Sequence, residues 1–115
     1  MSNHSAYRTF VDRLSKTKDS AREKSTKKRK SLGLRTAREN LDDLVDPGSF
    51  LEFGAFAVAA QRNRRDYEEL QLETSADGIL TGFCNINEDE VGEDNSHAAA
   101  IIYDYSVLAG SQGFF

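Results

Sequence analysis

The first part of the chain carries a helical pattern that becomes strongly basic toward its end. Its apolar residues follow the i, i+3, i+4 and i+7 spacing of one helix face, at Tyr7, Phe10, Val11 and Leu14. Beyond this stripe, lysine and arginine dominate from Lys24 to Lys30, and Gly33 then favours a helix end. The pattern predicts one helix over residues 5–31.

A second helix is predicted to begin at Thr36. Thr36 and Glu39 have the spacing of a capping box, in which each side chain accepts a hydrogen bond from the free backbone N–H of the other residue. The apolar positions that follow share one face: Ala37, Leu41, Leu44 and Val45. Asp46-Pro47-Gly48 should end the helix, because proline cannot continue the ladder and glycine allows a reversal.

The remaining pattern predicts strands that meet in a hairpin. Residues 50–54 are strand-like, residues 62–73 are charged and fit a short surface helix or a loop, and Ala76-Asp77-Gly78 is a turn signal. Residues 79–86 carry apolar residues on both faces and are bounded by turn residues, which is typical of a strand buried on both sides. Residues 98–107 form the strongest strand pattern. We expect these last two strands to pair across a loop at 87–97 that contains five acids.

Four side chains in these strands have predicted structural roles. Cys84 lies within an apolar strand and is interpreted as a small core residue. Asp104 falls within the strongest strand, and a buried carboxylate needs a partner, either an arginine or a backbone N–H at a turn. Its alternative role is to orient the glycine-rich turn that follows. Tyr103 and Tyr105 are expected to pack, with their hydroxyl groups at an edge.

The composition indicates a single small domain with an uneven charge. The 115 residues are 38% hydrophobic and 30% charged, with a net charge of -4. Residues 1–40 carry 12 Lys or Arg against 4 Asp or Glu, whereas residues 41–115 carry 3 against 15. This split predicts a basic arm on an acidic body, or two segments that attract each other. No apolar run reaches a membrane span, no secretory signal is visible and only one cysteine is present, so we expect a cytoplasmic protein.

Three ordered motifs then carry a family resemblance. The first runs from Thr36-Ala37-Arg38-Glu39-Asn40-Leu41 through Asp46-Pro47-Gly48-Ser49-Phe50-Leu51-Glu52. The second is Ala76-Asp77-Gly78-Ile79-Leu80-Thr81-Gly82, and the third is the segment Tyr103–Gly113. Together they resemble the carboxyltransferase domain of biotin-dependent acyl-CoA carboxylases, over roughly residues 34–113. Residues 57–62 and the Ala-Gly-Ser-Gln-Gly sequence at 109–113 look closest to the acetyl-/propionyl-CoA and single-chain, multidomain types.

The resemblance implies a fold and a division of the chain. We expect an α/β fold of the crotonase-like (ClpP/crotonase) type, in which ββα units stack into a spiral. The chain would be the N-terminal fragment of that fold, preceded by two helices. Residues 1–33 would form a basic N-terminal helix, and residues 34–115 would form the start of the carboxyltransferase N-terminal domain.

The resemblance also implies a reaction and the parts that it needs. The family transfers a carboxyl group from carboxybiotin to the α-carbon of an acyl-CoA through an enolate, whose charge is stabilised by backbone N–H groups. In the family those donors lie on later segments, so no catalytic residue is assigned here and we expect the fragment alone to be inactive. Gly110, Ser111 and Gly113 are the candidate contacts to coenzyme A, since N–H groups at a helix start can bind phosphate. The plainer interpretation of these residues is a tight turn that requires small side chains.

The expected partners follow from the same resemblance. They are the remainder of the carboxyltransferase, a biotin carrier that holds the carboxybiotin on another chain or domain, and a biotin carboxylase. A homo-oligomer is expected, without membrane association. No metal site is assigned, because His4, Cys84 and His97 lack ligand spacing.

A second interpretation belongs to another functional class. Lys27-Lys28-Arg29-Lys30 could make the chain an interaction module that binds an acidic partner or nucleic acid through its basic helix. The plainer interpretation of this run is a solvated helix end. Nucleic acid is the less favoured partner, because no aromatic residue is interleaved with the cluster for base stacking. A truncated reading frame without independent function is the third interpretation.

Overall fold

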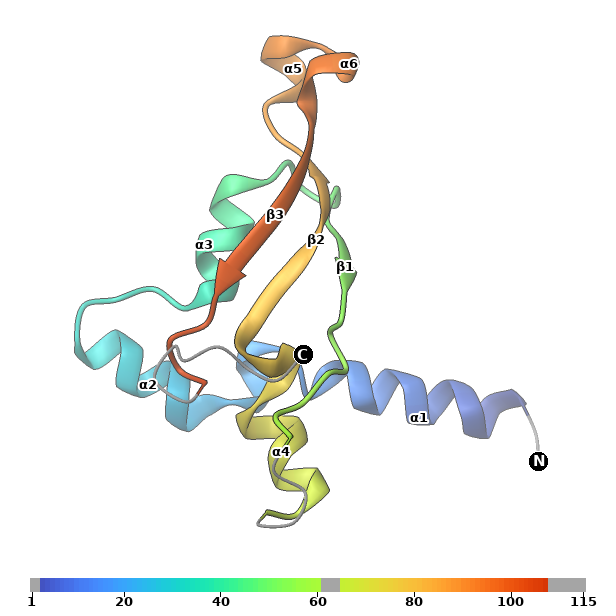
Figure 1. Cartoon of the computed structure of the whole chain (residues 1–115), viewed down its shortest axis with the longest axis vertical. Coiled ribbons are helices and arrows are strands. Elements are labelled where there is room, and N and C mark those ends of the chain that lie inside the picture. Colours follow the sequence, from blue (N-terminus) through green and yellow to red (C-terminus); the bar gives the residue numbers. More distant parts are fainter. Residues whose placement is uncertain (1–2, 61–64, 108–115) are drawn as a thin grey trace.

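The computed structural model describes residues 3–60 and 65–107, in which a three-stranded antiparallel sheet has helices on one face and beyond both of its ends (Figure 1). The strands are β1 (Leu51–Phe53), β2 (Ile79–Asn85) and β3 (His97–Tyr103), in the order β1-β2-β3. The β2–β3 hairpin pairs over its full length, from Ile79 opposite Tyr103 to Asn85 opposite His97. The predicted hairpin is therefore confirmed.

The N-terminal segment forms two α-helices instead of the single helix that the pattern predicts over residues 5–31. These are α1 (Asn3–Ser15) and α2 (Glu23–Ser31), separated by a 3-10 turn, η1 (Asp19–Ala21). The interruption comes where Ser15 and Thr17 donate side-chain hydrogen bonds to the Asp12 and Leu14 carbonyls, which compete with helix continuation. Thr17 is buried at this break between the helices. Helix α1 extends away from the sheet (Figure 1).

Helix α3 (Ala37–Leu44) begins with the predicted capping box. The Glu39 N–H donates to Thr36 Oγ1 at 3.1 Å, and the Thr36 N–H donates to Glu39 Oε1 at 3.2 Å. The hydrogen bond from the Thr36 backbone lowers the pKa of the Glu39 carboxyl group. The helix ends directly before Asp46-Pro47-Gly48, as expected.

The main core lies between α3 and one face of the sheet. Its buried members include Ala37, Leu41 and Val45 from the α3 segment and Leu80, Cys84 and Ala100 from the sheet. Leu44, predicted to share the apolar face, is 47% exposed. Around the helix axis, Leu44 points roughly 60° away from the mean direction of Ala37, Leu41 and Val45, so the sheet does not cover its side chain.

Only one face of the sheet is covered within the described residues, so the prediction that residues 79–86 are buried on both faces is wrong. Leu80 and Cys84 point into the core, whereas Phe83 on the opposite face is 58% exposed. Other large apolar side chains on this open face are also exposed: Leu51, Phe53, Ile101 and Tyr103. Apolar strand composition cannot distinguish a strand with two covered faces from one whose second face is open.

The two ends of the hairpin carry different structures. Its acidic loop forms two single-turn helices, α5 (Glu88–Val91) and α6 (Glu93–Ser96), at the far end of the molecule (Figure 1). At the other end, α4 (Tyr67–Glu73) leads into a 3-10 turn, η2 (Ser75–Gly78), and then into β2. Helix α4 is not only a surface element, because Leu70 is fully buried. None of the helices in the described ranges is long and apolar enough to cross a membrane.

Candidate functional site

The structure shows how the chain is held just before the predicted coenzyme contacts. Gly110, Ser111 and Gly113 themselves lie outside the described residues. β3 ends at Tyr103, earlier than the predicted strand end at residue 107, and a turn over Asp104–Val107 follows. The Asp104 N–H donates to the Gly78 carbonyl at 2.8 Å, and the Val107 N–H donates to the Asp104 carbonyl at 3.0 Å. This turn therefore sets the direction in which the chain leaves the sheet.

Asp104 organises the turn through both of its carboxylate oxygens. Oδ1 accepts hydrogen bonds from the Ser106 N–H at 2.9 Å and from the Ser106 hydroxyl group at 2.5 Å. Oδ2 accepts from Arg22 Nη1 at 3.0 Å. The predicted need of a buried carboxylate for an arginine or a turn N–H is met by both kinds of partner. The residue lies just after the strand and not within it.

Arg22 connects this turn to two other segments. Its Nε donates to the Leu72 carbonyl at 2.7 Å, near the end of α4, and its Nη2 donates to Ser106 Oγ at 3.1 Å. Only 6% of the Arg22 side chain and 10% of the Asp104 side chain are exposed, so the ion pair is nearly desolvated. Such a pair needs hydrogen bonds to its remaining donors, and these carbonyl and hydroxyl contacts supply them.

The Ala76-Asp77-Gly78 turn, which leads into β2, contacts the Asp104–Val107 turn. All three residues have positive φ values, 55°, 48° and 81°, which Gly tolerates and the two non-glycine residues adopt with strain. A Cβ atom on Gly78 would lie 3.3 Å from Val107 Cγ1. Gly78 thus allows the backbone turn to approach Val107, which is 1% exposed.

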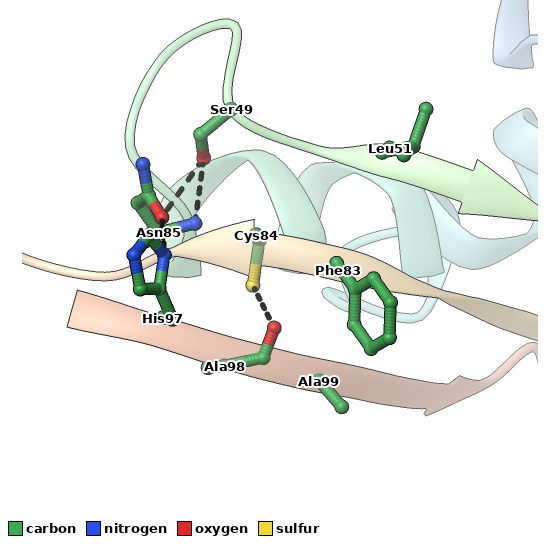
Figure 2. Close-up of a pocket in the computed structure, with 8 residues that line it drawn as sticks. All are labelled: Ser49, Leu51, Phe83, Cys84, Asn85, His97, Ala98 and Ala99. Atoms are coloured by element: carbon green, nitrogen blue, oxygen red, sulfur yellow. Dashed lines mark hydrogen bonds between the residues drawn. The ribbon is translucent and has the colours of Figure 1, made fainter. Parts of the chain in front are cut away.

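A cavity of about 600 Å³ lies at the opposite end of the sheet (Figure 2). Its polar lining comes from Ser49, in the loop before β1, and from Asn85 and His97, where β2 and β3 meet the hairpin loop. The other lining residues are Leu51, Phe83, Cys84, Ala98 and Ala99. His97 Nδ1 lies 2.9 Å from Asn85 Oδ1. Because an amide oxygen only accepts, Nδ1 carries the hydrogen in this contact.

The polar groups of this cavity hold the loop against the hairpin. The Ser49 hydroxyl group donates to the Asp46 carbonyl at 2.7 Å and accepts from the Asn85 N–H at 3.1 Å. Asp46 in turn accepts from the N–H groups of Asn87 and Glu88, at 2.9 and 3.0 Å. The Ser49 hydroxyl proton is directed at a backbone carbonyl, which does not activate an oxygen nucleophile. We interpret this set as a structural latch.

The other residues singled out in the sequence take structural or solvent positions. Cys84 is buried, as predicted, and burial raises the pKa of its thiol, with a further contribution from the charge of Asp46. His97 and His4 are exposed, and the described residues contain no cluster of three or more His, Cys, Asp or Glu that could hold a metal ion. Tyr105, expected to pack, is exposed, with the Arg29 guanidinium 5.9 Å from its ring centroid. Tyr103 is also more than half exposed.

Comparisons with known proteins assign the chain to a family. No protein-family model matches it. The chain is 34% identical, over 102 residues, to the biotin-dependent long chain acyl-coenzyme A carboxylase beta4 subunit of Mycobacterium tuberculosis, covering 89% of this chain and 17% of that protein. It superposes with a TM-score of 0.90 on a single-chain, multi-domain long-chain acyl-CoA carboxylase, with 47% identity, covering 95% of this chain and 11% of that one. The chain belongs to the carboxyltransferases of biotin-dependent acyl-CoA carboxylases.

A third carboxyltransferase adds a distant relative with a ligand. Transcarboxylase 12S, a hexamer described with methylmalonyl-coenzyme A and methylmalonic acid bound, aligns with a TM-score of 0.71 at 27% identity, over 96% of this chain and 19% of that one. The chain therefore spans less than a fifth of the length of each of these three proteins. Its mixed helix and sheet structure follows these neighbours, whose fold is the crotonase-like one.

The three family motifs occupy structurally demanding positions in this chain. The first places the capping box of α3 and the Asp46 latch, and the second places the left-handed turn before β2. The third begins with Tyr103, the last residue of β3, and continues with Asp104. Arg22, which completes the Asp104 network, lies outside all three motifs, and no local signal distinguishes it from the other basic residues of the N-terminal segment.

Proposed function

We propose that this chain contributes the beginning of a carboxyltransferase that moves a carboxyl group from carboxybiotin to an acyl-CoA. The observation that carries the proposal is the 47% identity, over 95% of the chain, to a single-chain, multi-domain long-chain acyl-CoA carboxylase. Residues 34–115 form the start of the carboxyltransferase N-terminal domain in this proposal, and residues 1–33 its basic leading segment. The working compartment is the cytoplasm.

The proposed substrate is a coenzyme A thioester of the acetyl or propionyl type. Support comes from the related transcarboxylase described with methylmalonyl-coenzyme A, and from the glycine-containing segment that follows the Asp104 turn. Backbone N–H groups of Gly110, Ser111 and Gly113 would bind the coenzyme, since small residues let a phosphate approach the main chain. Enolate formation at the α-carbon would then require oxyanion donors from other parts of the enzyme.

The open sheet supports the proposal that more of the carboxyltransferase packs here. The face opposite α3 exposes Leu51, Phe83 and Ile101, and a contiguous apolar surface of this kind is unusual for an isolated monomer. Among the described residues, β3 also has no strand partner on its outer edge. Further ββα units of the spiral would cover the apolar face and pair with the outer edge of β3. The biotin carrier, the biotin carboxylase and a second copy of the carboxyltransferase complete the proposed assembly.

A chimera tests this function. Residues 34–107 of this chain would replace the equivalent segment of the 47% identical single-chain carboxylase, and carboxylation of acetyl-CoA and propionyl-CoA would be measured. We expect activity within about tenfold of the parent, because the transplanted core would keep its packing. A folded, oligomeric chimera without activity would contradict the proposal. The isolated 115-residue chain is expected to show no carboxyl transfer. Turnover by this chain would contradict the proposal that other parts of the enzyme supply the oxyanion donors.

The exposed lysines of α2 favour a second candidate, an interaction module for an acidic polypeptide or nucleic acid. Lys24, Lys27 and Lys28 all point to solvent, whereas Arg29 binds the Arg35 carbonyl. Binding through these lysines would weaken steeply with salt, since it would rest on released counterions. Titration of the chain with fluorescent single-stranded DNA and with a polyglutamate peptide, at low and physiological salt, would detect it.

A further inference from the structure

We propose that α2 and the exposed ring of Tyr105 together bind single-stranded nucleic acid. The inference goes beyond carboxyl transfer, and it rests on the second candidate function, which it commits to one partner, a polynucleotide. The sequence alone disfavours this partner, because no aromatic residue accompanies the lysines of α2 in the chain. The fold supplies the missing aromatic ring from the turn that follows β3.

Tyr105 lies beside α2 with its ring open to solvent. The residue is 62% exposed, and the Arg29 guanidinium lies over its ring, 5.9 Å from the centroid. Arg29 is itself held in place, since its Nε and Nη2 donate to the Arg35 carbonyl at 3.1 and 2.9 Å. A cation over one face of a ring leaves the other face for stacking, and every nucleobase presents a π face. Tyr105 can therefore serve as a platform for a base.

A buried network fixes this ring relative to α2. Arg22 lies directly before the helix, and its guanidinium donates to Asp104 and Ser106, the two chain neighbours of Tyr105. The Arg22–Asp104 ion pair is nearly desolvated, so separating it would leave two buried charges without partners. The platform is thus in place before a base arrives, which lowers the ordering cost of binding.

The lysines of α2 supply positive charge for a phosphate backbone. Lys24, Lys27 and Lys28 are exposed, and none of them forms an ion pair within residues 3–60 and 65–107. They point away from the helix side that carries Arg22 and Arg29. The acidic helices α5 and α6 lie at the other end of the molecule (Figure 1), so their charge is largely screened at α2 in physiological salt.

The first test measures binding and the role of the ring. Fluorescence anisotropy would follow the 115-residue chain with a labelled oligodeoxyadenylate of about 10 nucleotides, a length within the usual single-strand site sizes. We expect a dissociation constant of about 1–100 µM, as for other non-specific binding. Tyr105→Leu should weaken binding about tenfold, and Tyr105→Phe, which keeps the π face, should bind like wild type. The matched control is Tyr7→Leu on α1, where the tyrosine is 64% exposed, and it should change nothing.

The second test measures the role of charge through salt. Three lysine–phosphate contacts predict a slope of log affinity against log salt of about −2, because each contributes about −0.7 on a single strand. Lys27→Gln combined with Lys28→Gln should bring the slope to about −0.7, whereas Tyr105→Leu should leave it unchanged. Arg8→Gln, at an exposed arginine on α1, is the control and should keep the wild-type slope. All the substituted side chains are exposed, so the variants should keep the fold, which circular dichroism checks.

Each contrary result overturns a stated part of the proposal. No binding to the oligonucleotide at low salt would overturn it entirely, and equal effects of Tyr105→Leu and Tyr7→Leu would remove the stacking platform. Polyglutamate and inorganic polyphosphate carry no bases; if either bound as tightly as the oligonucleotide, the surface would be one for acidic polymers and not for nucleic acid. These results are independent of carboxylation by the chimera, so the two proposals fail separately.

Discussion

Gly82 offers the sharpest test of the packing between β1 and β2. It lies opposite Glu52 in the strand register, and its φ value is not in the left-handed region, so glycine is not required there by backbone conformation. A Cβ atom would lie 2.2 Å from the Leu51 carbonyl oxygen and 2.6 Å from Phe50 Cε1. Glycine is needed at this position because another backbone comes too close for any side chain.

The cost of Gly82→Ala follows from these distances. Ordinary contact begins at 3.4 Å, so the Leu51 backbone must move by about 1.2 Å, the difference from 2.2 Å. A backbone shift of that size disrupts a strand that pairs over only three residues. Overpacking of a core typically costs about 1–3 kcal/mol, and the loss of ladder hydrogen bonds adds about 1 kcal/mol each. We expect a total loss of about 3 kcal/mol, against about 5–15 kcal/mol for a domain of ordinary stability.

The matched control is Gly33→Ala. Gly33 has a φ of +73° and no atom within 4 Å of a built Cβ, so alanine there meets strain without a clash. Its expected cost is about 1 kcal/mol. Urea unfolding monitored by circular dichroism gives both free energies, and cross-strand NOEs between β1 and β2 report the local effect. A Gly82→Ala variant that loses no more stability than Gly33→Ala, with its β1 NOEs intact, would refute the steric argument.

Three further outcomes can be checked on the same chain. Because the folded pKa of Glu39 is depressed, its stabilising contribution is present above the unfolded pKa and is lost as the pH falls through the folded pKa; Glu39→Gln should flatten the acid limb of stability against pH, and an unchanged limb would contradict this. Because burial raises the pKa of Cys84, iodoacetamide should modify the folded chain far more slowly than the urea-unfolded chain, as measured by mass spectrometry; equal rates would show that the thiol is accessible. Asp46→Ala should cost about 2 kcal/mol in urea unfolding, because two N–H groups lose a charged acceptor, whereas Asp43→Ala, with an exposed partner, should cost under about 0.5 kcal/mol; similar losses would show that Asp46 does not hold the loop against the hairpin.

Local chemistry in the sequence determined several elements closely. The capping box at Thr36 and Glu39, the stop at Asp46-Pro47-Gly48 and the hairpin across the acidic loop all depend on residues within a few positions of one another. Their hydrogen-bonding and steric requirements are satisfied locally, so the pattern is readable without the fold. The core position of Cys84 followed for a similar reason, since an apolar strand next to a turn is normally packed.

Only the tertiary structure decided which of these elements meet. The partner of Asp104 could be predicted as a kind of group but not as Arg22, because contact across 82 residues depends on the path of the whole chain. The burial of Thr17, whose carbonyl accepts from Arg38, and the open face beside Phe83 have the same origin, since an apolar or helical pattern does not specify what lies opposite to it. Sequence fixes what each segment requires from its surroundings, and packing fixes which distant segment supplies it.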